Sequence, residues 1–513
     1  MRLGQLIDGM EIEDFKGDPG LVIEGIAYDS RLVKPGLVFV ALRGHERDGH
    51  QYIEEAISKG AVAVVSERVL PEALIIEGLR GIDPRVATIH VIDSRKALSR
   101  LAVRFYQRPF KQMNLIGITG TNGKTTTSYL LESILIAAGK DPGVIGTVNY
   151  RISDQVWKAP VTTPESLDLM RVLRKMADQG ATDVIMEVSS HALDQGRVRD
   201  CPFRVAIFTN ISRDHLDYHG SMDSYFDAKA LLFRGLKKPE HRGHAIAVIN
   251  GDDPKGKDLG ELTDAKILTY GLGTGCDVRA VSVSVKREGL TGRLITPEGE
   301  TDIYSPLIGD FDIYNILAAA AGALSLGIGL DRVTAGIGGL KGVPGRMELV
   351  ENDRSLAIVV DYAHTPDALL KALEAGRRLT NGRLLTVFGC GGDRDKGKRA
   401  QMGLVAGQES DMVFITSDNP RTEDPMAIAE QIEKGVMESG LKEYLLDLDR
   451  RSAIRRAVKM AGNGDLVLIA GKGHEDYQII GTKRREFDDQ KVAAEAASGL
   501  LPSQGGSSDD RLG

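Results

Sequence analysis

The chain has 513 residues, of which 42% are hydrophobic and 27% are charged, and its formal net charge is -7. At roughly 150 residues per domain this length predicts three or four domains, each able to bury its own core. The 65 basic and 72 acidic residues leave no basic surplus, so nucleic acid is not an expected partner.

The three cysteines are too few and too scattered for a disulfide framework or a zinc cluster. The N-terminus lacks the basic and apolar regions of a signal peptide. No stretch reaches the roughly 18 uninterrupted apolar residues of a membrane helix. We therefore expect a cytoplasmic protein without a membrane span.

The first predicted unit is a small N-terminal α/β domain, residues 1–112. Apolar runs at 38–42 and 61–65 have the length of strands, and a helix is expected at 52–59. The pattern of this unit does not reveal its chemistry.

The second predicted unit is a central domain, residues 113–342. Strands are expected at 115–118, 184–188, 205–210 and 245–250, and a helix is expected to begin at Lys124. Continuous apolar strands joined by helical crossovers predict a mostly parallel sheet of the P-loop ATPase type.

The turn before that helix reads GITGTNGKTTT from Gly117 to Thr127. Backbone N–H groups and a helix N-terminus in this position cradle phosphates. We expect Lys124 to meet the terminal phosphates and Thr125 to ligate magnesium. Ile118 stands where the general P-loop pattern has glycine, so the match is to a variant motif, and the alternative is a glycine turn with a helix cap.

Two further strand ends bring titratable residues to the same sheet edge. Glu187 lies inside an apolar run, and a buried carboxylate needs a cation or a donor. Magnesium held with the nucleotide is one candidate partner, and a structural arginine is the alternative. His215 follows the next strand and is a candidate metal ligand, although a lone histidine is more often structural.

Lys229 falls on the apolar stripe of an amphipathic helix predicted over 221–233. Burial lowers the pKa of a lysine, and the neutral amine can take up carbon dioxide as a carbamate that ligates magnesium. The alternative is a buried stem with the ammonium in water, and the residues alone favour that alternative.

The third predicted unit, residues 343–500, is a Rossmann-like doubly wound sheet. Its strands are expected at 357–361, 384–388, 412–416, 444–448 and 466–470. Residues 501–513 are polar and rich in glycine, which predicts a disordered tail.

Three loops of this unit follow strands and carry charge. Arg394 and Arg421 are each suited to grip a carboxylate with a planar fork, and Glu475 is suited to receive an ammonium. Two arginines and an acid at one sheet edge predict an amino-acid site, although each residue alone is as well explained as a solvated loop charge.

Together these motifs resemble the Mur ligase family, most closely its MurE branch, whose members add the third residue of the peptidoglycan stem peptide. The likeness covers about residues 20–490. It rests on GITGTNGKTTT at 117–127, EVSSH at 187–191, TNISRDHLDYH at 209–219, DAK at 227–229, GRME at 345–348, DYAHTP at 361–366 and DNPR at 418–421.

The resemblance implies that the N-terminal domain holds UDP-N-acetylmuramoyl-L-alanyl-D-glutamate, the central domain ATP, and the C-terminal domain the incoming amino acid. The implied contacts to the uridine nucleotide are Ser30, His45, Glu46 and Arg47. The implied contacts to the muramoyl peptide are Thr162, Thr163, Ser189, Gln195 and Arg197. The implied contacts to ATP are Gly120, Thr121, Asn122, Gly123, Lys124, Thr125, Thr126, Asn315 (toward adenine), Arg346 and Asp361.

The resemblance also implies that Lys229 is carbamylated, which reverses the preference drawn from the residues alone. The implied Mg²⁺ ligands are Thr125, Glu187, His215 and carbamylated Lys229, and the implied catalytic residues are Lys124, Lys229, Glu187 and His215.

Family members that use meso-2,6-diaminopimelate carry the loop Asp-Asn-Pro-Arg, which residues 418–421 match, and lysine-adding relatives usually lack its arginine. Diaminopimelate ends in a second carboxylate that lysine does not have, so an arginine supplies the charged partner. The implied amino-acid contacts are Arg394, Asp418, Asn419, Pro420, Arg421, Gly471 and Glu475.

The implied activity is ATP-dependent peptide-bond formation in peptidoglycan precursor synthesis, through an acyl phosphate and with release of ADP. Closure of the domains is expected to exclude water. The alternatives are a lysine-adding ligase, a folylpolyglutamate synthase, or a P-loop NTPase that joins nothing. A monomer is expected.

Overall fold

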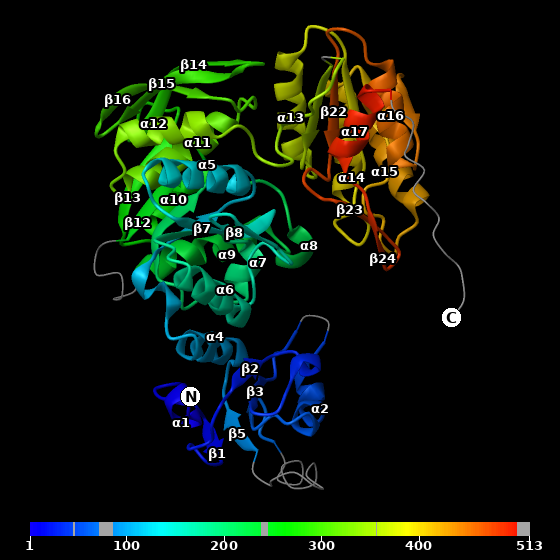
Figure 1. Cartoon of the computed structure of the whole chain (residues 1–513). Coiled ribbons are helices and arrows are strands. Elements are labelled where there is room, and N and C mark those ends of the chain that lie inside the picture. Colours follow the sequence, from blue (N-terminus) through cyan, green and yellow to red (C-terminus); the bar gives the residue numbers. More distant parts are fainter. Residues whose placement is uncertain (45–46, 71–85, 238–244, 355, 500–513) are drawn as a thin grey trace.

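The computed structural model describes residues 1–44, 47–70, 86–237, 245–354 and 356–499 (Figure 1). The candidates His45 and Glu46 and the tail predicted at 501–513 lie outside the described residues. The expected fold class is confirmed, because the chain forms three α/β units that each have their own sheet. The sheets lie within the predicted domain bounds, and the bounds themselves stay a prediction. Within the described residues, no helix is long and apolar enough to cross a membrane.

The N-terminal unit has a five-stranded sheet in which only β1 runs antiparallel to its neighbour. In spatial order its strands are β1 (Asp14–Lys16), β5 (Ala87–His90), β4 (Ala63–Ser66), β3 (Leu37–Val40) and β2 (Gly25–Ala27), and its helices are α1 (Leu3–Ile7), α2 (Ile53–Ser58) and α4 (Ser94–Phe105). The strands predicted at 38–42 and 61–65 and the helix at 52–59 correspond to β3, β4 and α2. The other strands were not predicted, because β1 and β2 have only three residues and β5 alternates buried with half-buried residues instead of forming a continuous apolar run.

The central unit has an eleven-stranded sheet whose middle is parallel and whose two margins are antiparallel. In spatial order its strands are β16 (Gly299–Ser305), β15 (Gly289–Thr296), β14 (Val278–Lys286), β13 (Lys266–Gly271), β12 (Ile246–Asn250), β11 (Phe203–Phe208), β6 (Asn114–Thr119), β10 (Asp183–Glu187), β7 (Pro142–Ile145), β8 (Asn149–Ile152) and β9 (Gln155–Lys158). The predicted strands are β6, β10, β11 and β12 at its centre. The antiparallel margins were not predicted.

Helices cover both faces of this sheet. Its helices are α5 (Lys124–Ala137), α6 (Ser166–Asp178), α7 (Ser190–Asp194), α8 (Leu216–His219), α9 (Met222–Arg234), α10 (Pro254–Glu261), α11 (Asp312–Leu324) and α12 (Leu330–Gly339). The buried side chains of α5, α11 and α12 form one core with the sheet, and those of α6, α9 and α10 form the other. The second core continues into the N-terminal unit through α4, which joins the two units by apolar packing.

The C-terminal unit has a six-stranded sheet that is parallel except for β17. In spatial order its strands are β17 (Glu348–Leu349), β18 (Ala357–Asp361), β22 (Leu466–Ala470), β19 (Leu384–Phe388), β20 (Met412–Ile415) and β21 (Tyr444–Leu446), followed along the chain by the hairpin β23 (Tyr477–Ile480) and β24 (Lys483–Glu486). Its helices are α13 (Pro366–Leu379), α14 (Lys398–Glu409) and α15 (Pro425–Glu438) on one face and α16 (Arg450–Met460) and α17 (Asp489–Ala497) on the other. All five predicted strands are present, because continuous apolar runs identify strands buried on both faces.

Candidate active site

The P-loop lies between β6, at the centre of the sheet, and α5. Gly120 and Gly123 have φ angles of +150° and +86°, conformations that favour glycine. A Cβ on Gly120 would overlap Thr209 Oγ1 beyond β11, and a Cβ on Gly123 would overlap Asn315 Oδ1 of α11. The two glycines therefore allow close packing of the loop, and they bring Asn315, the predicted adenine contact, beside it.

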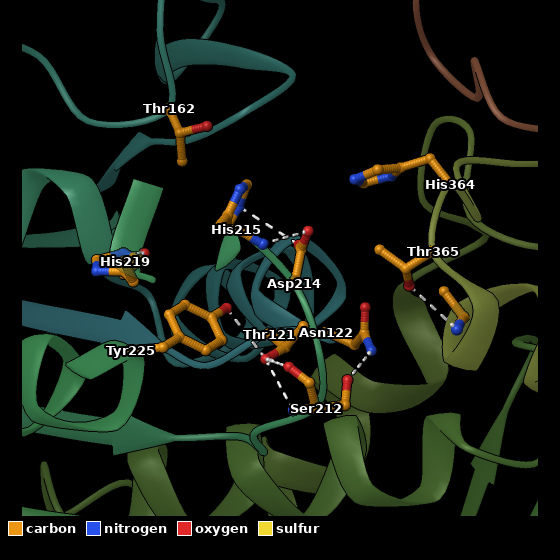
Figure 2. Close-up of polar contacts among 12 residues, drawn as sticks. Thr121, Asn122, Thr162, Ser212, Asp214, His215, His219, Tyr225, His364 and Thr365 are labelled. Atoms are coloured by element: carbon orange, nitrogen blue, oxygen red, sulfur yellow. Dashed lines mark hydrogen bonds and ion pairs between the residues drawn. The ribbon is translucent and has the colours of Figure 1, made fainter. Parts of the chain in front are cut away.

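Hydrogen bonds fix the P-loop to the segment after β11. Thr121 N–H donates to Asn210 O at 2.8 Å, and Asn122 N–H donates to Asn210 Oδ1 at 3.0 Å. Thr209 Oγ1 donates to Asn122 O at 2.6 Å. Figure 2 shows Thr121 also linked to Tyr225 of α9, with 3.1 Å between the hydroxyl oxygens. These hydrogen bonds fix the conformation of the loop.

Two lysines share one carbonyl of this loop. Lys124 Nζ donates to Gly120 O at 2.9 Å and to Thr121 O at 2.8 Å, and Lys229 Nζ donates to Gly120 O at 2.8 Å. Lys229 is 1% exposed, so the interpretation that its ammonium reaches water is wrong. Burial, and then the nearby charge of Lys124, hold the pKa of Lys229 well below its ordinary value. Burial also lowers the pKa of Lys124.

Glu187 ends β10 and is buried at the foot of the P-loop helix. Its carboxylate accepts hydrogen bonds from Thr125 Oγ1 at 3.0 Å, Thr147 N–H at 3.0 Å and Thr147 Oγ1 at 2.8 Å. Among the described residues, no arginine pairs with this carboxylate, so the alternative of a structural arginine is wrong. Sequence reasoning missed Thr147, which follows β7; only the pairing of β7 with β10 brings it to Glu187.

His215 precedes α8 in a left-handed conformation, with φ of +55°. Its Nε2 lies 3.4 Å from Asp214 Oδ2, and burial lowers the pKa of its imidazole to about 4. Figure 2 shows His215 and Asp214 between Tyr225 of the central unit and His364 of the C-terminal unit.

The predicted Mg²⁺ ligands are Thr125, Glu187, His215 and carbamylated Lys229. Among the described residues, no three His, Cys, Asp or Glu side chains are grouped as a metal site. Of the predicted set only Glu187 and His215 belong to these types. Thr125 meets Glu187 directly, and a carbamate on Lys229 would add oxygen ligands of the kind that Mg²⁺ prefers. The residues fit the ion, and the ligand set stays a prediction.

The residues expected to contact the muramoyl peptide lie together beside Glu187. Thr163 Oγ1 donates to the Glu187 carbonyl at 2.8 Å and accepts from Ser189 N–H at 3.1 Å. Arg197 donates to Thr163 O at 2.9 Å and to Gln195 Oε1 at 2.7 Å. Thr162 Oγ1 lies 3.2 Å from Thr147 Oγ1, which joins this group to the Glu187 contacts.

The candidates in the N-terminal unit are less informative. Ser30 is buried and donates from Oγ to Glu55 Oε2 at 2.9 Å, and Arg47 is exposed.

The C-terminal unit touches the P-loop at its hinge. Arg346 Nη2 donates to Thr125 Oγ1 at 3.2 Å, and Asn122 Nδ2 donates to Asp367 Oδ2 at 3.0 Å. Asp361 instead accepts two backbone N–H groups, from Met347 at 2.7 Å and from Ala363 at 2.8 Å. Of the two nucleotide candidates here, Arg346 reaches the P-loop and Asp361 holds the hinge.

The first turn of α5 completes the predicted ATP contacts. Thr125 and Thr126 are both buried there.

Asn315, the predicted adenine contact, lies on α11. Its Nδ2 donates to Asp312 Oδ1 at 2.9 Å, and burial raises the pKa of Asp312 to about 7.

The three charged loops of the C-terminal unit meet at one sheet edge, as predicted. Arg421 Nη1 donates to Gly392 O at 2.7 Å, and Arg394 Nη1 donates to Asp393 O at 2.9 Å. Asn419 Nδ2 donates to Glu475 Oε2 at 2.9 Å.

The backbone brings the remaining candidates into the same group. A Cβ on Gly392 would overlap Pro420 O, and one on Gly471, whose φ is +114°, would lie 3.1 Å from Asp418 Oδ2. The loops are therefore packed directly on one another.

Two features of this edge were missed. Lys472 is fully buried and contacts Glu475 and Asn419. The β23–β24 hairpin supports the loop after β20, since Arg421 N–H donates to Ile479 O at 3.1 Å and Ile479 N–H to Asn419 Oδ1 at 2.9 Å. A lysine between two glycines is typical of a solvated loop charge, so no local pattern indicated that Lys472 is buried.

Three family models match the chain in succession. The Mur ligase family catalytic domain matches residues 22–106, the Mur ligase middle domain 118–323, and the Mur ligase glutamate ligase domain 345–473.

The chain is 47% identical over 511 residues to UDP-N-acetylmuramoyl-L-alanyl-D-glutamate--2,6-diaminopimelate ligase of Geobacter metallireducens, covering 97% of this chain and 98% of the relative. A solved structure of a ligase with that name is 36% identical, with a TM-score of 0.67 and coverage of 97% and 98%. A MurF ligase from Thermotoga maritima in complex with ADP is 22% identical, with a TM-score of 0.60 and coverage of 88% and 94%, and shows a shared fold.

Proposed function

The chain belongs to the Mur ligase family, and from this we propose that it joins meso-2,6-diaminopimelate to UDP-N-acetylmuramoyl-L-alanyl-D-glutamate at the expense of ATP. The observation that carries the proposal is similarity along nearly the whole chain to relatives named for this reaction. The P-loop and the arginine-bearing loops supply, in one chain, a phosphate site and a site for a charged amino acid.

The proposed reaction has two steps. The γ-carboxylate of D-glutamate attacks the γ-phosphorus of ATP, which gives an acyl phosphate and ADP. The amine of diaminopimelate then attacks the acyl carbon, phosphate leaves, and the amine loses a proton as the amide forms. Lys124 faces the phosphates and offsets the charge that develops in the first step.

Thr163, Ser189 and Arg197 hold the acceptor peptide in this proposal, because their mutual hydrogen bonds place them beside Glu187. Thr125, Glu187, His215 and a carbamate on Lys229 would hold Mg²⁺, which would neutralise phosphate charge when bound.

Carbamylation of Lys229 agrees with the hydrogen bonds that Lys124 and Lys229 both donate to the carbonyl of Gly120. Two ammonium groups on Gly120 O repel one another, which favours a neutral amine at Lys229. That nitrogen adds to the carbon of carbon dioxide and releases a proton, and a cation becomes an anionic oxygen ligand.

The amino acid is oriented by charge. Arg421 and Arg394 receive its carboxylates, and Asp418 and Glu475 receive an ammonium. A lysine substrate would leave Arg421 without the second carboxylate, which is the physical basis for preferring diaminopimelate. We further propose a monomer that acts in the cytoplasm, where ATP is available.

The test measures phosphate release from ATP with the UDP-muramoyl dipeptide and either meso-diaminopimelate, L-lysine or no amino acid, together with product masses. We expect release and a tripeptide product with diaminopimelate alone. A tripeptide product with lysine would agree with a ligase but would refute the preference for diaminopimelate. Phosphate release at the same rate in all three conditions would identify an NTPase that joins nothing.

A further inference from the structure

The loop after β22 contains a lysine that no step of the proposed reaction uses. Lys472 is 0% exposed, and a lysine this deeply buried needs partners for its charge. Its Nζ donates to Glu475 Oε2 at 3.0 Å and to Asn419 Oδ1 at 3.3 Å, and it lies 3.6 Å from Asp418 Oδ1. One ammonium thus contacts three of the predicted amino-acid ligands.

Two of these partners are held rigidly. Asn419 Nδ2 donates to the same Glu475 oxygen at 2.9 Å, so Lys472, Asn419 and Glu475 close a triangle of contacts. Asn419 Oδ1 also accepts from Ile479 N–H at 2.9 Å, which ties the triangle to β23. The orientation of Glu475 therefore depends on Lys472.

The third partner is left incomplete. Asp418 is 7% exposed, and no donor among the described residues reaches its Oδ1 within hydrogen-bond distance. The nearby guanidinium of Arg450 pairs with Asp489 through Nε at 2.8 Å and Nη2 at 2.7 Å, and its buried Nη1 makes no hydrogen bond to Asp418. Lys472 forms ion pairs with both Glu475 and Asp418, but the 3.6 Å contact leaves Asp418 Oδ1 without a hydrogen bond, and one cation offsets only one of the two negative charges.

We propose that Lys472 is a positioning residue of the amino-acid site, which fixes Glu475 through Asn419 and holds Asp418 beside it through an ion pair. This inference rests on the proposed function. An ammonium has three N–H donors, enough for both carboxylates at once.

The test compares the wild-type chain with Lys472→Met, which keeps most of the volume and removes the charge. The KM for meso-diaminopimelate should rise about tenfold to a hundredfold, the loss expected for charge-assisted hydrogen bonds. The KM values for ATP and for the UDP-muramoyl dipeptide should stay within about twofold of wild type, because Lys472 contacts neither predicted site. A merely structural role would reduce the active fraction, and therefore kcat, without a selective change in one KM.

Lys483→Met is the matched control, since Lys483 is exposed on β24 of the adjoining hairpin. It should leave every constant unchanged. Lys472→Gln keeps N–H donors at a similar distance from the backbone. We expect this variant to fold even if Lys472→Met does not. The KM for meso-diaminopimelate should rise in this variant too.

The outcomes separate the two claims. A wild-type chain that ligates no amino acid refutes the proposed function. A wild-type chain that ligates diaminopimelate, with a folded Lys472 variant of unchanged KM, refutes the positioning role alone. Failure of both variants to fold would also overturn that role in favour of a structural one.

Discussion

At the scale of single residues, buried charges define both halves of the site. Lys124 and Lys229 converge on one P-loop carbonyl, and Glu187 accepts three hydrogen bonds beneath them. In the C-terminal unit, Lys472 contacts the carboxylates of Glu475 and Asp418, which lie on two different loops. Each of these groups is costly to bury alone, so the pairs and their ligands explain why the charges lie there.

Arg421→Ala should raise the KM for diaminopimelate about tenfold to a hundredfold, because a charge-assisted contact to one carboxylate is lost. The preference over L-lysine, measured as the ratio of kcat/KM values, should fall by a similar factor. Arg485→Ala, on exposed β24, serves as the control. An unchanged preference would contradict the assignment of Arg421 to the second carboxylate.

Asp312 predicts a pH dependence of stability. Burial raises its pKa to about 7, so between about pH 4 and pH 7 the folded state holds a proton that the unfolded state has lost. This contribution therefore makes the free energy of unfolding fall as pH rises through that window. Asp312→Asn removes the contribution and should flatten the curve.

The measurement is the thermal midpoint at pH 5 and pH 8 in both proteins. The thermal midpoint of the wild type should fall more from pH 5 to pH 8 than that of the Asp312→Asn variant, since all other titrating groups are common to both proteins. Equal losses would show that Asp312 keeps an ordinary pKa.

At the scale of elements, two helices meet so closely that the contact requires glycine. A Cβ on Gly336 of α12 would overlap the backbone of Ile134 in α5. The helix α5 begins at the P-loop, so this packing also fixes the direction in which the loop presents its N–H groups.

Gly336→Ala should destabilise the central unit by about 1–3 kcal/mol, because the helices must move apart. Gly338→Ala, in the same helix, places its Cβ 3.5 Å from Tyr304 O, an ordinary contact, and should be neutral or slightly stabilising. Circular dichroism during thermal denaturation compares the two. Equal midpoints would mean that the packing relaxes without cost.

At the scale of the whole molecule, the reacting groups belong to different units. The C-terminal unit meets the P-loop through Arg346 and Asp367, and a surface ion pair joins Lys158 to Asp476 at 3.6 Å. Figure 1 shows the C-terminal unit beside the central one, with α13 nearest to it. We therefore expect bound ATP and amino acid to draw the two units closer together.

Addition of a non-hydrolysable ATP analogue with both substrates should decrease the radius of gyration in small-angle scattering, because ligands that bridge the units favour the closed arrangement. The Lys124→Ala chain, which lacks the phosphate contact, should respond less. Scattering profiles that do not change with the full set of ligands would count against closure.

Local sequence patterns were sufficient to predict the three α/β units, the P-loop, and the strand ends that carry Glu187, His215, Arg394 and Arg421, because continuous apolar runs and glycine-rich turns are local signals. The antiparallel margins of the central sheet escaped this prediction, because β8 and β9 have only four residues each and β14, β15 and β16 are partly exposed and lack a continuous apolar run.

The tertiary packing sets which groups each charged side chain contacts. It placed Lys229 out of water, brought Thr147 to Glu187 through the pairing of β7 with β10, and buried Lys472 among acidic loops. Some of these contacts join residues that are distant along the chain, and others bury Lys472, a residue of a polar loop. Burial and electrostatic partners are properties of packing, and no local pattern encodes them.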